Sequence, residues 1–155
     1  MINKYFKLDI FFLSIKKLKK GSINQTYEIN INDDKYILQK INTKIFNENV
    51  IIDMDNITNH LKKYIEVPIL LNNEYGRIYY KYNNNLYRIY NYIEGYDINK
   101  EKISDIQVYE LGKYLYDFHI HLKKYDYIPK HLIENFHNTK YYINKISDII
   151  NKYEN

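Results

Sequence analysis

The first 92 residues alternate between apolar and polar side chains in short runs, which is the pattern of half-buried β-strands. Turn residues separate several of these runs, at Gly21, at Asp33-Asp34 and at residues 83–85. The predicted strands cover residues 9–20, 25–31, 36–41, 67–71, 78–82 and 86–92. We expect these segments to form an antiparallel sheet of about five strands.

A helical period replaces this alternation between residues 47 and 64. Apolar residues recur there at spacings of three and four, at Val50, Met54, Ile57, Leu61 and Tyr64. Asn47 is a suitable N-cap, and Glu48 places an acid in the first turn, where the helix dipole favours it. This helix should pack its apolar stripe against the sheet.

Further helices are predicted beyond residue 103. Ser104 and Gln107 have the spacing of a capping box, and Ile103 and Val108 that of a hydrophobic staple. Apolar stripes follow at Val108, Leu111, Leu115, Phe118 and Leu122, and again at Ile143, Ile146, Ile150 and Tyr153. The expected fold class is α+β, with one helix packed on the sheet and two or three helices after it. The two stripes must find a partner or stay exposed.

The turn around Gly21 carries the clearest candidate chemistry. Gly21, Ser22 and Asn24 form a small polar turn between two strands, and such a turn lets backbone N–H groups approach phosphate oxygens. Lys40, near the end of the next strand, could add a point charge. Taken alone, these residues fit an ordinary β-hairpin with a solvated lysine better than a phosphate site.

Four motifs in sequence order change that interpretation. They are Gly21-Ser22-Ile23-Asn24-Gln25-Thr26-Tyr27, Tyr36-Ile37-Leu38-Gln39, Tyr87-Arg88-Ile89-Tyr90-Asn91-Tyr92-Ile93-Glu94 and Phe136-His137-Asn138-Thr139. Together they resemble the aminoglycoside phosphotransferase (kinase-like) family, most closely its N-acetylhexosamine 1-kinase branch. The resemblance runs from residue 18 to residue 142. It implies a protein-kinase-like N-lobe at residues 1–92, a connector at 93–99 and the helical start of a second lobe at 100–155.

The resemblance implies that the chain binds ATP. Gly21, Ser22 and Asn24 would lie near the phosphates, and Lys40 would be the phosphate lysine. Leu38, on the same strand face as Lys40, would line the adenine pocket. Lys19 stands where the family usually has a first glycine, which weakens this assignment and predicts weak binding.

The remaining assignments concern the helix and the connector. Asp55 is the candidate acid that would orient Lys40, although an unpaired surface position is nearly as good an interpretation. Tyr90, Tyr92 and Ile93 lie at the strand end and hinge, where backbone groups would bond the adenine edge. Arg88 is predicted to be structural, as an ion-pair partner, rather than substrate-binding.

The activity implied by the resemblance is transfer of the ATP γ-phosphate to a hydroxyl of a small acceptor. The acceptor that the resemblance implies is a sugar of the N-acetylhexosamine kind. Aminoglycoside, choline and homoserine-type acceptors stay open. The family's His-x-Asp catalytic loop is absent: His119-Ile120-His121 lacks the aspartate, and Asp53-Met54-Asp55 lies in a predicted helix. No catalytic residue or metal ligand is therefore assigned, and this chain alone is expected to be inactive.

The absent loop leaves two interpretations open. In the first, magnesium ligands and acceptor contacts belong to a C-terminal lobe that could be separately encoded. In the second, the chain is a non-catalytic module that binds nucleotide or a partner.

Composition narrows the remaining classes. The 155 residues include no cysteine, which excludes a disulfide framework. No apolar run approaches the length of about 20 residues of a membrane span, and the run at residues 10–13 is too short for a signal peptide. The net charge is +4, but 19 acidic residues are interspersed among 23 basic ones, so nucleic-acid binding is not expected. A cytoplasmic protein is expected.

Overall fold

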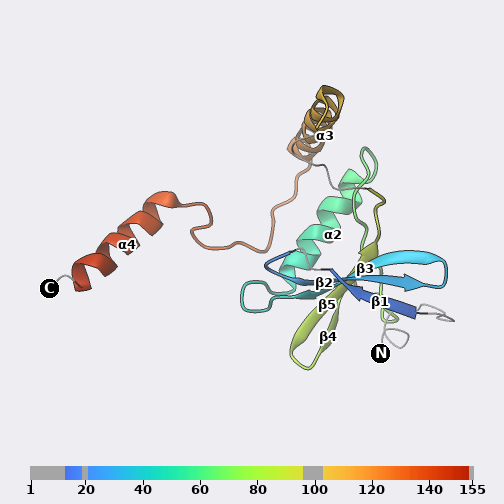
Figure 1. Ribbon diagram of the computed structural model, residues 1–155, viewed down its shortest axis with the longest axis horizontal. Helices are drawn as coiled ribbons and strands as arrows, with labels where there is room; N and C mark the ends of the chain where they lie inside the picture. Colours follow the sequence, from blue (N-terminus) through green and yellow to red (C-terminus); the bar gives the residue numbers. More distant parts are fainter. Residues whose placement is uncertain (1–12, 19–20, 96–102, 154–155) are drawn as a thin grey trace.

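The computed structural model describes residues 13–18, 21–95 and 103–153. Within them, five strands form one antiparallel sheet in the order β1-β2-β3-β5-β4 (Figure 1). The strands are β1 (Leu13–Lys17), β2 (Gln25–Ile31), β3 (Asp34–Ile41), β4 (Tyr80–Tyr82) and β5 (Asn85–Asn91). With the helix packed on this sheet and the helices that follow, the predicted α+β fold class is confirmed.

The predicted strand at residues 67–71 is only a single bridge, between Leu70 and Tyr90. The outer edge of β5 is shared along its length: β4 pairs with residues 85–87, and the segment around Leu70 takes the end near Tyr90. The backbone N–H of Leu71 donates to the carbonyl of Ile89 at 2.9 Å, which holds this segment on the sheet. Because β4 occupies most of the β5 edge, the remaining free part of that edge is long enough for a bridge but not for a strand.

Apolar side chains cover both faces of the sheet. On one face, here called the α2 face, helix α2 (Asn49–Leu61) packs on the sheet, and the buried cluster there is Ile41, Ile51, Leu70 and Leu86. On the opposite face a second cluster contains Ile29, Ile31 and Ile89, with Leu38 packed against it. Because strand side chains alternate, Gln39 shares the α2 face with Ile41, and Lys40 shares the opposite face with Leu38.

Helix α2 is shorter than the predicted range of residues 47–64. The Asn47 carboxamide accepts a hydrogen bond from the backbone N–H of Asn49 at 3.0 Å, just before the helix starts. Glu48 occupies the N-cap position and forms an ion pair with Lys81 at 2.9 Å, instead of lying in the first turn. Tyr64 lies beyond the helix, where its ring stacks on His121 with centroids 3.8 Å apart.

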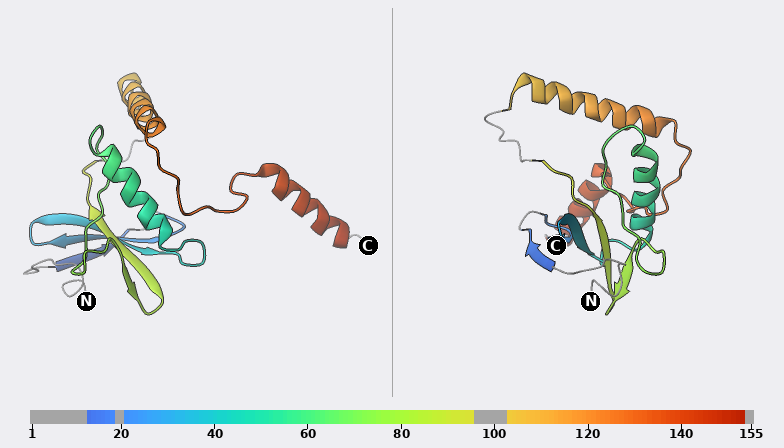
Figure 2. Two further views of the ribbon diagram at one scale, coloured as in Figure 1. Left: turned by 180° about the vertical axis from the view of Figure 1, so that it is seen from behind. Right: turned by 90° about the vertical axis from the view of Figure 1, so that its right-hand side faces the viewer.

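Helix α3 (Asp105–Lys123) begins with the predicted capping box, in which Ser104 and Gln107 bond each other's backbone N–H. It lies across one end of α2, as the right-hand view of Figure 2 shows. Helix α4 (Thr139–Tyr153) lies apart from the sheet (Figure 1). Neither α3 nor α4 has a buried residue, so the predicted apolar stripes are largely exposed.

The segment after α3 returns to α2 and is fixed there by Asp53. The carboxylate of Asp53 accepts hydrogen bonds from the Tyr127 hydroxyl at 2.7 Å and from the backbone N–H groups of Lys130 and His131, both at 2.8 Å. A ring stack between His60 and Tyr125, with centroids 4.0 Å apart, adds to this contact. The α2–α3 arrangement therefore rests on polar and aromatic contacts, not on an apolar core.

Part of the predicted connector, residues 96–99, lies outside the described residues, as do Lys19 and the start of the first predicted strand. The predicted division into lobes stays a prediction. Of the helices that the structure describes, none combines the length and the apolar character needed to cross a bilayer.

Candidate functional site

The predicted phosphate turn is fixed to the end of β3. Gly21 has φ +117°, in the region that favours glycine. The Asn24 side-chain oxygen accepts a hydrogen bond from the backbone N–H of Asn42 at 2.9 Å. Gly21 and Ser22 are exposed, so their backbone groups are open to a ligand. The turn is therefore held at its end while its front stays accessible.

Lys40 lies beside this turn but on the face opposite α2. Its register partners are Gln25 on β2 and Tyr87 on β5. It lines a shallow pocket of about 360 Å³ together with Ile23 and Asn42. Leu38, on the same face, packs against the buried cluster of Ile29, Ile31 and Ile89.

The structure does not bring Asp55 and Lys40 together. The Asp55 carboxylate accepts a hydrogen bond from the Asn59 amide at 2.8 Å and lines a different pocket, next to Tyr125. The ion pairs between described residues are Lys35–Glu94 and Lys81–Glu48. Because α2 covers the other face of the sheet, a carboxylate on this helix cannot orient a lysine that points away from it.

The connector residues are held against β3. The backbone N–H of Tyr92 donates to the carbonyl of Lys35 at 3.3 Å, and the Lys35 ammonium lies 5.2 Å from the Tyr92 ring centroid. Glu94 forms an ion pair with Lys35 at 2.9 Å.

Tyr90 belongs to the α2 face, where it packs against the Ile41 cluster, and burial raises the pKa of its hydroxyl. Ile93, between Tyr92 and Glu94, is half-buried.

A polar row across the sheet was missed by the sequence prediction. Thr26, Gln39 and Arg88 occupy paired positions on β2, β3 and β5. Arg88 was expected to be an ion-pair partner, but its guanidinium donates to the Gln39 side-chain oxygen through Nε at 3.0 Å and Nη2 at 2.7 Å. Among the described residues, an amide takes the place of the expected carboxylate. Burial lowers the pKa of Arg88.

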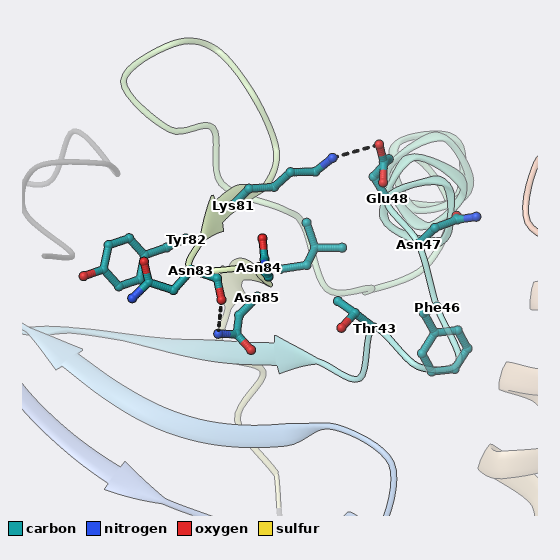
Figure 3. Close-up of a pocket in the computed structure, with 10 residues that line it drawn as sticks. Thr43, Phe46, Asn47, Glu48, Lys81, Tyr82, Asn83, Asn84 and Asn85 are labelled. Atoms are coloured by element: carbon teal, nitrogen blue, oxygen red, sulfur yellow. Dashed lines mark hydrogen bonds and ion pairs between the residues drawn. The ribbon is translucent and has the colours of Figure 1, made fainter.

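A pocket larger than the one at Lys40 lies elsewhere. It has a volume of about 510 Å³ and lies between the β4–β5 turn and the segment that leads into α2 (Figure 3). Its walls include Asn83, Asn84 and the Glu48–Lys81 ion pair as well as the apolar side chains of Phe46 and Leu86. The hydrogen bond from Lys81 lowers the pKa of Glu48, so the pair is ionised near neutral pH. None of the residues predicted to bind ATP lines this pocket.

Within residues 13–18, 21–95 and 103–153, no group of three or more potential metal ligands is placed to hold a metal ion. Asp53 and Asp55 lie on one helix, but Asp53 is occupied by the segment at residues 127–131 and Asp55 by Asn59.

The fold is similar to that of part of two solved phosphotransferase structures. No protein-family model and no curated protein matches the chain. Among solved structures, it is similar to an amicoumacin kinase in complex with AMP-PNP, Ca²⁺ and Ami, with a TM-score of 0.66 and 19% identity over 73% of this chain. It is also similar to a spectinomycin phosphotransferase in complex with ADP and spectinomycin, with a TM-score of 0.55 and 14% identity over 75% of this chain.

The chain spans only 36% of the amicoumacin kinase and 34% of the spectinomycin phosphotransferase. At these identities the likeness concerns the fold. Neither structure is named as an N-acetylhexosamine kinase, so the predicted branch stays a prediction.

Proposed function

We propose that this chain is the ATP-binding part of a small-molecule phosphotransferase. The observation that carries the proposal is the clasp between Asn24 and Asn42, which holds an open glycine turn at the end of β3 in a sheet of kinase-like fold. An open turn that is held at its end can present backbone N–H groups to phosphate oxygens without first being ordered.

In this proposal the phosphates lie near Gly21, Ser22 and Asn24, and the adenine lies toward the connector at Tyr92 and Ile93. Two cations lie on the strands nearby, Lys40 on β3 and Arg88 on β5. Magnesium and the acceptor hydroxyl would be held by residues outside this chain, which has no His-x-Asp motif. Either a larger chain or a separately encoded lobe would supply them.

The acceptor proposed from the sequence motifs is a sugar of the N-acetylhexosamine kind. The two similar structures are named for amicoumacin and spectinomycin, so an antibiotic of that kind is the second candidate acceptor. In both cases the reaction is transfer of the γ-phosphate of ATP to a hydroxyl group.

A second candidate function is that of a module that binds nucleotide without catalysis. The absence of a His-x-Asp motif from the sequence favours it. Both functions require that the chain bind ATP.

Titration calorimetry with ATP and Mg²⁺ tests the proposal on matched variants. Asn24→Asp keeps an acceptor for the backbone N–H of Asn42 but adds a negative charge beside the phosphates. We expect this variant to lose about tenfold in ATP affinity through charge repulsion. The control is Asn138→Asp, where Asn138 accepts from the backbone N–H of Tyr141 beside α4.

The control carries the same charge change far from the turn and should bind ATP as the wild type does. Equal losses in both variants would contradict a site at the turn. No binding by the wild-type protein at millimolar ATP would contradict the proposal as a whole.

A further inference from the structure

Arg88 is a cation held in place without an opposing carboxylate among the residues that the structure describes. It is half-buried, and among the described residues its hydrogen bonds go only to the side-chain oxygen of Gln39. A neutral amide orients the guanidinium but leaves its charge uncompensated. A guanidinium has five N–H donors in a planar fork, so donors remain for an anion.

Gln39 is itself fixed, which makes the orientation of Arg88 definite. Its side-chain nitrogen donates to the Thr26 hydroxyl at 3.1 Å, while its oxygen accepts from Arg88. The three side chains therefore form one chain of hydrogen bonds across β2, β3 and β5. Such an arrangement keeps an arginine extended on the sheet in the absence of a ligand, which lowers the entropic cost of binding one.

The row lies between the two parts of the proposed nucleotide site. Thr26 is the second residue of β2, directly after the glycine turn. Tyr90 follows Arg88 by two residues on the same face, with the Arg88 guanidinium carbon 5.9 Å from its ring centroid. The connector at Tyr92 comes next along the chain. A ligand that extends from the connector to the turn on the α2 face would pass this row.

Lys40 has a different environment. It lies on the opposite face, where the neighbouring Leu38 packs into a separate apolar cluster. Its shallow pocket contains a second cation, Lys44, and no tyrosine. Lys40 is half-buried, no hydrogen bond or ion pair to another described residue holds its ammonium, and α2 cannot position it.

We propose that Arg88, oriented by Gln39 and Thr26, supplies the cation for the phosphates of the bound nucleotide on the α2 face, in the role that the sequence suggested for Lys40. This inference rests on the proposed ATP-binding function. It adds that the polyphosphate is held by a bidentate arginine on β5.

Inorganic tripolyphosphate and ATP, each titrated at low ionic strength, test the inference on Arg88→Met and Lys40→Met. Both substitutions remove one positive charge and keep an aliphatic stem. We expect Arg88→Met to lower the affinity for both ligands about tenfold or more, because it removes charged hydrogen bonds. Lys40→Met should stay within about twofold of the wild type, because its ammonium lies on the opposite face of the sheet and is not held by other described residues.

Gln39→Glu keeps Arg88 and gives it a carboxylate partner, so this variant tests the inference even if Arg88→Met fails to fold. The new ion pair neutralises the guanidinium, and the affinity for tripolyphosphate should again fall about tenfold. The control is Gln107→Glu, which makes the same change in the capping box of α3, where glutamate is also accepted. It should not alter the affinity.

Two results would overturn the inference: tripolyphosphate affinity that is unchanged in both Arg88→Met and Gln39→Glu, or a large loss in Lys40→Met alone. Absence of tripolyphosphate binding to the wild-type protein would overturn it as well. The proposed function fails separately, when the wild-type protein does not bind ATP. Tripolyphosphate binding that depends on Arg88 would still support the anion site in that case.

Discussion

Asp53 joins two segments that are more than 70 residues apart in the sequence. Its side chain is 7% exposed. Burial raises the pKa of Asp53, but the hydrogen bonds from the Lys130 backbone, the Tyr127 hydroxyl and the His131 backbone outweigh burial and hold the pKa below its ordinary value of 3.8. The same contact, led by the hydrogen bond, raises the pKa of Tyr127 to about 12. The ionised carboxylate therefore stabilises the docked segment.

Asp53→Asn should release residues 127–131 from α2. An asparagine presents an N–H₂ group toward backbone donors, so it loses acceptor capacity where three donors converge. We expect a cost of about 1–3 kcal/mol in the docking of this segment. Hydrogen exchange at Lys130 and His131, together with thermal unfolding, measures it. Asp55→Asn is the matched control. Among the described residues, the Asp55 carboxylate accepts a hydrogen bond from Asn59 of the same helix, so its substitution should change stability by less than about 0.5 kcal/mol.

The same pair of variants gives a pH dependence with a definite sign. A carboxyl whose pKa is lowered by folding adds stability that is full above the ordinary pKa of 3.8 and is lost as the pH falls through the folded value. The stability difference between the wild type and Asp53→Asn should therefore be constant near neutral pH and shrink below 3.8. A difference that grew on acidification would show that this carboxylate is not the source of the stability.

At the scale of elements, local sequence signals predicted what local contacts decide. The capping box at Ser104 and Gln107 uses only neighbouring residues, and it is confirmed. The sequence did not predict on which face of the sheet α2 packs, because both faces of β3 are apolar. Ile37 and Ile41 lie on one face and Tyr36 and Leu38 on the other, so alternation defines two faces without saying which one meets the helix. The assignment of Lys40 depended on that choice.

The polar row of Thr26, Gln39 and Arg88 was also beyond prediction from local sequence. Thr26, Gln39 and Arg88 are spread over 63 positions of the sequence, and only the strand register makes them neighbours. Alternation along β3 places Gln39 on the face of Ile41, but Thr26 and Arg88 lie on other strands and join it only through the register. The Asp53 contact has no local signal at all, since its partners lie in an irregular segment after α3.

Ser104→Ala tests the role of the capping box in α3. The substitution removes the acceptor for the Gln107 backbone N–H, and we expect a loss of about 1 kcal/mol in the local stability of the first turn of α3. Hydrogen exchange at Gln107 and Val108 reports it. Ser147→Ala in α4 is the control, and it should raise the local stability of its helix. The Ser147 hydroxyl donates to the carbonyl of Ile143 within the helix, and alanine is the better helix former. Faster exchange in both helices would contradict this account.

At the scale of the whole molecule, the chain has a formed sheet lobe and helices with exposed apolar stripes. In α3, Leu111 is 50% exposed and Leu115 48%; in α4, Ile146 is 57% exposed. Core formation is thus concentrated in the sheet and α2. This distribution agrees with a chain that spans about a third of the length of the solved structures it resembles.

The 155-residue chain with ATP, Mg²⁺ and N-acetylglucosamine or N-acetylgalactosamine should give no sugar 1-phosphate. Phosphoryl transfer depends on positioning and on metal-bound carboxylates together with a base, and the sequence contains no His-x-Asp motif to provide them. Chromatography of the products against a protein-free control measures this. Product that increases in proportion to the protein concentration would reveal catalytic residues that this account does not contain.

The most direct test of the central claim, that the glycine turn and the α2 face hold a nucleotide, is an amide chemical-shift titration with ATP and Mg²⁺ up to millimolar concentration. Shifts should concentrate at Gly21, Ser22 and Asn24 and at the backbone of Arg88, while Ile146 and the rest of α4 stay unchanged. Saturable shifts at these positions would establish the site. If Gly21, Ser22, Asn24 and Arg88 all stay unchanged at millimolar ATP, the claim is wrong.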